Sequence, residues 1–168
     1  MQFQHLVLSV AIISTTALAD YTPPTGFRDI PWASSPNAVM GGMALVEDHG
    51  DMKCYTRKKE SLKIGDADLK RIVYCYYKDR FFALTVKFSG ATNFTKIQET
   101  LTQKFDEPLR PNRYMDKYWW GIGGSTVTIM LEYNDISKVG DFSYIYEPIS
   151  AEQTKNEKQM ATEATKDL

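Results

Sequence analysis

The sequence has few of the residues on which most catalytic centres depend. Among its 168 residues there are two histidines and two cysteines, and beyond residue 19 the only histidine is His49. There is no His-x3-His or Cys-x-x-Cys spacing, so we expect no metal site. There is also no Gly-x-Ser-x-Gly turn and no phosphate-binding glycine loop. These absences argue against most enzyme classes and against a bound cofactor.

An excess of one charge and a membrane-length apolar run are also missing. The 20 basic residues are balanced by 21 acidic ones, whereas a nucleic-acid-binding domain usually carries a basic surface. A bilayer-spanning helix needs roughly 20 apolar residues, and the longest apolar run, Leu6 to Ile13, is far shorter. We therefore expect neither nucleic-acid binding nor membrane insertion.

The first 19 residues differ from the rest because they contain no Asp, Glu, Lys or Arg. The apolar run is followed by Ala17-Leu18-Ala19, which has the small-x-small form that signal peptidase cuts. We expect cleavage before Asp20, a position where a lipoprotein would present cysteine. The protein is thus predicted to be periplasmic or secreted.

The chain has an even number of cysteines, Cys54 and Cys75, and is predicted to enter an oxidising compartment. Both features favour a disulfide between them. The bond would close a loop of about 22 residues and contribute about 3 kcal/mol. Free thiols or a redox pair are the alternatives, although redox cysteines are normally closer in sequence.

Two helices are predicted from apolar spacing. Ser35-Pro36 resembles a helix start, and the apolar residues that follow keep helical spacing until His49-Gly50. A second, amphipathic helix should begin at Thr92 or Asn93 and end near Pro108. The strands expected from β-branched and aromatic residues are Lys53 to Arg57, Leu62 to Ile64, Ile72 to Tyr77, Phe81 to Phe88, Lys117 to Gly121, Thr126 to Tyr133 and Asp141 to Glu147.

This order predicts an α+β fold. Each half of the chain reads as a helix followed by strands, so we expect a tandem αβββ repeat whose strands form a single antiparallel sheet covered on one face by two helices. In the strand from Phe81 to Phe88, simple alternation places Phe82 on the same face as Leu84. The predicted division is a signal peptide over 1–19, an α+β domain over 20–149, and a polar tail over 150–168 that is either a frayed helix or disordered.

The uncovered face of such a sheet would carry aromatic side chains. Tyr and Trp on an exposed sheet suit protein or sugar binding, although aromatic pairs also stabilise sheets without any ligand. Trp119 and Trp120 are the expected centre of this surface. The candidate binding residues are Tyr74, Tyr76, Tyr118, Trp119 and Trp120.

Acidic residues near turns give a weaker enzyme hypothesis. Asp66 and Asp68 stand two residues apart, and acidic residues flank His49. They could serve a hydrolase, but acidic pairs in turns more often form Asx turns or solvated surface. We expect no catalytic residues.

The run Phe27-Arg28-Asp29-Ile30-Pro31-Trp32, together with Ile64-Gly65-Asp66-Ala67-Asp68-Leu69 and the segment from Ile72 to Phe81, resembles a group of small, uncharacterised exported bacterial proteins. The element order is similar to the tandem αβββ domains of β-lactamase inhibitor proteins. That resemblance implies a non-catalytic role through a sheet surface. We therefore expect a domain that binds a protein partner in the cell envelope or outside the cell, with a carbohydrate- or peptidoglycan-binding module as the alternative.

Overall fold

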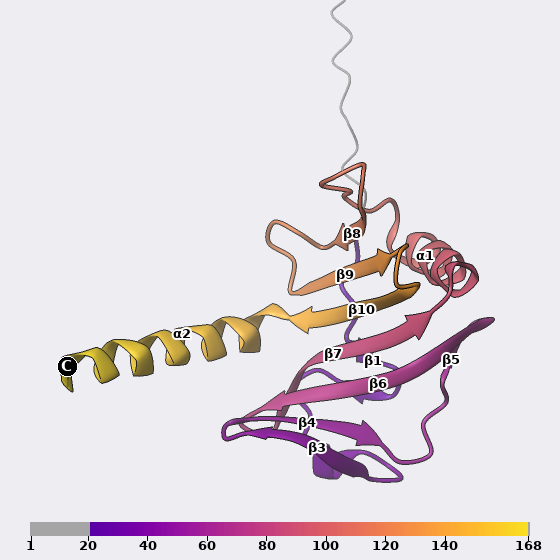
Figure 1. Cartoon of the computed structure of the whole chain (residues 1–168). Coiled ribbons are helices and arrows are strands. Elements are labelled where there is room, and N and C mark those ends of the chain that lie inside the picture. Colours follow the sequence, from indigo (N-terminus) through magenta and orange to yellow (C-terminus); the bar gives the residue numbers. More distant parts are fainter. Residues whose placement is uncertain (1–20, 168) are drawn as a thin grey trace, which may run out of the picture.

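The computed structural model describes residues 21–167, which form an antiparallel sheet with two α-helices (Figure 1). The helical elements are η1 (Pro36–Ala38), α1 (Ala91–Phe105), α2 (Glu147–Ala164) and η2 (Thr165–Asp167). The strands are β1 (Gly26–Phe27), β2 (Ile30–Pro31), β3 (Met43–His49), β4 (Met52–Arg57), β5 (Lys63–Ile64), β6 (Ala67–Tyr77), β7 (Arg80–Ser89), β8 (Asp116–Trp120), β9 (Val127–Asn134) and β10 (Val139–Tyr146).

The main sheet joins two antiparallel meanders. Its strand order is β3-β4-β6-β7-β10-β9-β8, and β5 adds to the end of β6. The first meander runs from β3 to β7 and the second from β8 to β10, and they meet where β7 pairs with β10 from Ala83 to Ser89. The predicted α+β class and the antiparallel main sheet are confirmed, and β1 and β2 form a separate two-stranded sheet.

The helix predicted between Pro36 and His49 does not form. A single 3-10 turn, η1, is followed by Gly41 and Gly42 with φ of 85° and 78°, a left-handed conformation that ends a helix. The residues that follow form β3, which pairs with β4 as a hairpin. Apolar spacing cannot separate a helix from a strand in so short a segment, so the first half of the chain has no αβββ unit.

The segment before η1, residues 21–35, takes the place of the missing helix on the sheet, and we call it the N-terminal lead. Phe27 lies edge-on to Tyr144 at 5.6 Å, and Trp32 stacks on Phe81 at 4.7 Å between ring centroids. Helix α1 covers the remainder of the same face through its buried Ile97, Leu101 and Phe105. We call this covered side the inner face and the opposite side the outer face.

A bulge changes which side chains of β7 point inward. The register in which β6 pairs with β7 shifts by one residue between Cys75 and Tyr76. As a result Phe81 joins Leu84 in the main core, whereas Phe82 packs in a second cluster on the outer face. The prediction that Phe82 shares a face with Leu84 is therefore wrong, because a bulge adds one residue and inverts the alternation beyond it.

The C-terminal segment is a helix. At its start, Ile149 packs against Tyr77 and Phe82 on the outer face, and Glu152 pairs with Arg80 at 2.8 Å. Asn156 donates to the Tyr77 hydroxyl at 2.9 Å. Beyond that contact α2 extends away from the sheet (Figure 1). The two helices thus contact opposite faces, which differs from the predicted pair on one face.

The predicted disulfide is confirmed. Cys54 on β4 lies directly opposite Cys75 on β6, and the two are bonded with a Cα–Cα distance of 4.1 Å. The bond ties together two strands that are already neighbours in the first meander.

We expect mass spectrometry of unreduced protein to detect a linked peptide containing Cys54 and Cys75. Replacing both residues by alanine should lower the free energy of unfolding by about 3 kcal/mol, because the unfolded chain regains the freedom of a closed loop. Denaturant titration of the oxidised protein and the double variant measures this difference. Two freely alkylated thiols in the native protein would contradict the assignment.

Candidate functional site

Four of the five candidate binding residues are part of the core. Tyr74, Tyr76, Tyr118 and Trp120 are 0%, 1%, 6% and 3% exposed. They lie on the inner face, beneath α1 and the N-terminal lead. The prediction that they form an exposed aromatic surface is therefore wrong. Alternation identifies which residues share a face, but it does not say which face is covered.

The buried aromatic groups are held by structural hydrogen bonds. The Tyr74 hydroxyl donates to Glu60 Oε2 at 2.7 Å, and Trp120 Nε1 donates to the Asp106 carbonyl at 2.8 Å. Glu60 also pairs with Arg28, which donates to the carbonyl of Lys63 at 2.9 Å. This network attaches the N-terminal lead to the sheet, and burial raises the pKa of Tyr74 to about 12.

Trp119 is the one candidate on the outer face. It stands in register with a row of half-buried side chains that crosses five strands, about 19 Å at normal strand spacing. We call this row the outer strip. From β6 to β8 it consists of Val73, Thr85, Ser143, Met130 and Trp119.

A second row of small or apolar side chains lies beside the outer strip. It consists of Cys75, Ala83, Ile145 and Thr128, again in register. The outward side of an antiparallel sheet with one solvated face is usually polar, so two largely apolar rows are unusual. Sequence reasoning missed them, although apolar residues at consecutive positions such as Ile129 and Met130 were a usable signal.

Charged residues border the other side of the outer strip. Lys117 Nζ and Glu132 Oε2 are 2.8 Å apart and neutralise each other. Arg71 and Lys87 are exposed and directly opposite each other, and within residues 21–167 neither forms a salt bridge. Lys87 lies between Arg71 on β6 and Asp141 on β10. Asp141 offsets one of the two positive charges, and Arg71 leaves this corner of the rim positive.

The residues of the hydrolase hypothesis are not brought together. His49 lies beside the β3–β4 turn, near the end of β6 marked by Tyr77. Asp66 and Asp68 lie at the opposite end of β6, about 30 Å away along the strand. Asp68 Oδ1 is 3.4 Å from Lys63 Nζ, and both side chains are largely exposed. This placement offers no shared cleft for acid–base chemistry.

Across residues 21–167 no group of three or more His, Cys, Asp or Glu side chains is placed to hold a metal ion. In the same part of the chain no helix is both long and apolar enough to cross a membrane.

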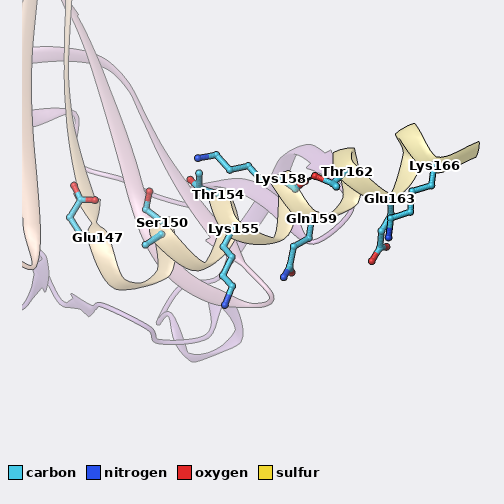
Figure 2. Close-up of a pocket in the computed structure, with 10 residues that line it drawn as sticks. Glu147, Ser150, Thr154, Lys155, Lys158, Gln159, Thr162, Glu163 and Lys166 are labelled. Carbon is cyan, nitrogen blue, oxygen red and sulfur yellow. Dashed lines mark hydrogen bonds between the residues drawn. The ribbon is translucent and has the colours of Figure 1, made fainter. Parts of the chain in front are cut away.

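One face of α2 forms a shallow depression of about 810 Å³ (Figure 2). Its lining, from Glu147 to Lys166, comes entirely from α2 and the turn that follows it. Lys155, Lys158 and Glu163 project outward from this helix (Figure 2). Since a single helix cannot enclose a ligand, this is open polar surface.

Comparison with known proteins gives no match: no protein-family model, curated protein or solved structure matches the chain. The outer strip is therefore defined by its geometry alone.

Alkaline titration tests the burial of the inner-face tyrosines. An unfolded chain ionises tyrosine near pH 10, whereas Tyr74 in the folded protein keeps its proton to about pH 12. The stabilisation from these neutral phenols is complete below about pH 10 and is lost as the pH rises towards 12. We expect tyrosinate absorbance at 295 nm to rise together with the loss of β-sheet circular dichroism.

Tyr74→Phe is the informative variant, because it removes the ionisable group and retains the ring. It should reduce the amplitude of the cooperative absorbance step. Full ionisation of the tyrosines near pH 10 in a protein that keeps its native circular dichroism would contradict their burial.

Proposed function

We propose that this protein is an exported, non-enzymatic domain that binds a protein partner through the outer strip. The observation that carries the proposal is the outer strip, in which Val73, Met130 and Trp119 are apolar, on a sheet face that α1 does not cover. In the second row, Cys75 and Ala83 pack against the cluster that contains Ile149 of α2. Apolar surface rimmed by charge is typical of protein interaction sites. Trp119 at one end supplies the type of residue that is enriched among energetically dominant contacts.

The rim suggests the chemistry of the partner. The outer strip favours an apolar segment about 19 Å long, enough to contact all five strands. Arg71 favours a carboxylate near the β6 end of that segment, because it is the positive charge that Asp141 does not offset. The expected partner therefore presents apolar side chains followed by an acidic residue.

The proposal of export rests on the predicted signal peptide. The signal peptide predicted over 1–19 lies outside the described residues. The Cys54–Cys75 disulfide is compatible with an oxidising compartment, and a periplasmic or extracellular location would place the partner in the cell envelope or outside the cell.

The alternatives receive less support from the geometry. A sugar-binding platform needs an exposed aromatic ring, whereas Trp120 is buried and Trp119 is half-buried with its Nε1 enclosed. The hydrolase hypothesis depends on His49 and the aspartates, which lie at opposite ends of β6. We therefore propose no second function.

Site-specific photo-crosslinking in the producing cells tests the binding surface. A photoreactive amino acid at Thr85 or Ser143 should form a discrete adduct with the partner. The same amino acid at Tyr114, which is 80% exposed in a loop, should form none. Adducts of equal yield from Tyr114 would contradict a specific outer surface.

Charge reversal tests the partner chemistry. We expect Arg71→Glu to reduce the adduct formed from Ser143 several-fold, because it replaces attraction for a carboxylate by repulsion. Lys158→Glu makes the same charge change on the exposed surface of α2 and should leave the adduct unchanged. Equal thermal stability of the two variants separates a binding defect from misfolding, and an unchanged adduct with Arg71→Glu would contradict the proposed partner chemistry.

Export has its own measurement. Intact mass analysis of protein from the envelope or medium should give a chain that begins at Asp20. An uncleaved chain confined to the cytoplasm would contradict export, whatever the outcome of the crosslinking.

A further inference from the structure

A small pocket lies on the inner face, away from the outer strip. It has a volume of about 220 Å³ and opens between α1, the N-terminal lead, β5 and β10. Its apolar walls come from four separate elements, unlike the single-helix surface of α2. The side chains that form these apolar walls are Phe27, Ile64, Ile97, Leu101, Phe142 and Tyr144.

The polar side chains of the pocket are confined to a few positions. On α1, Thr100 and Lys104 follow Ile97 by three and seven residues, so they lie on the helix face that lines the pocket. The Thr100 hydroxyl is already bonded to the Lys96 carbonyl at 2.7 Å. Arg28 also lines the pocket, but its charge is compensated by Glu60.

Lys104 is the cation available to a ligand. It is exposed, and its Nζ lies 5.3 Å from the centre of the Phe105 ring. Within residues 21–167 it forms no salt bridge with a carboxylate. A pocket with apolar walls and one uncompensated cation is complementary to a molecule with an apolar body and one negative group.

Tyr144 adds a buried hydroxyl-bearing wall. The residue is only 5% exposed. A phenol is a neutral hydrogen-bond donor at physiological pH, and burial raises the pKa of this one further above its usual range.

We propose that this pocket binds a small monocarboxylate with an apolar body, of the size of phenylacetate or hexanoate. The size follows from the volume, since an apolar cavity of about 150 Å³ accommodates benzene. The ring or short acyl chain would lie against Phe27, Ile64 and Leu101, which keep exposed surface in the pocket, and the carboxylate would meet Lys104. This site is separate from the outer strip and does not depend on the proposed partner.

Titration of the full mature protein with phenylacetate, hexanoate and benzyl alcohol, followed by nuclear magnetic resonance, tests the proposal. We expect saturable shifts of the Ile64 and Leu101 methyl signals with at least one of the carboxylates. The neutral benzyl alcohol should bind more weakly than phenylacetate. No saturable shift with either carboxylate would overturn the proposal.

Two variants separate the charge from the apolar walls. Lys104→Gln should weaken carboxylate binding two- to fivefold, as expected for an exposed ion pair, and should leave benzyl alcohol unaffected. Lys96→Gln, on the same helix but outside the pocket lining, is the matched control. Equal carboxylate affinity in the Lys104→Gln variant and the native protein would overturn the assignment.

Thr100→Phe is designed to fill the pocket from α1 and should abolish the methyl shifts. Its circular dichroism and melting temperature report whether the fold is intact. Undiminished carboxylate binding by a folded Thr100→Phe protein would place the ligand elsewhere and overturn the proposal.

Discussion

The structure depends on burying the inner face of its antiparallel sheet. That face is lined with large aromatic side chains, and one helix, α1, covers only part of it. The N-terminal lead covers the rest through Phe27, Ile30 and Trp32, and Arg28 attaches it to Glu60. The N-terminal lead contains little regular structure, yet it covers the sheet as a helix would, because each of its aromatic side chains buries a large area.

The same constraint shapes both candidate sites. The N-terminal lead and α1 are separate elements, and their side chains do not fill all the space between them. The pocket beside Lys104 lies there, where both elements approach β10. On the other side of the sheet, α2 covers the end near Tyr77 and Phe82, where Cys75 and Ala83 of the second row also pack. The outer strip consequently stays accessible although its side chains are largely apolar.

Much of the fold could be predicted because it depends on local signals. The β6–β7 hairpin was predicted from two segments rich in β-forming residues on either side of Lys78-Asp79. Lys78 and Asp79 both have positive φ, as a tight hairpin turn requires. Helix α1 followed from the spacing of its buried side chains. The segment before His49 was misassigned because its apolar residues fit a helix and a strand equally well, and pairing with β4 decided the outcome.

The candidate site was less predictable, because it depends on which side of each strand is covered. The sequence by itself determined the α+β composition, the disulfide pairing of the only two cysteines, and the alternation that groups Tyr74 with Tyr76. Only the tertiary structure decided that this group faces the core and that Trp119 faces outward. The reason is physical: alternation distinguishes two faces, but long-range packing of α1 and the N-terminal lead selects the one that is buried.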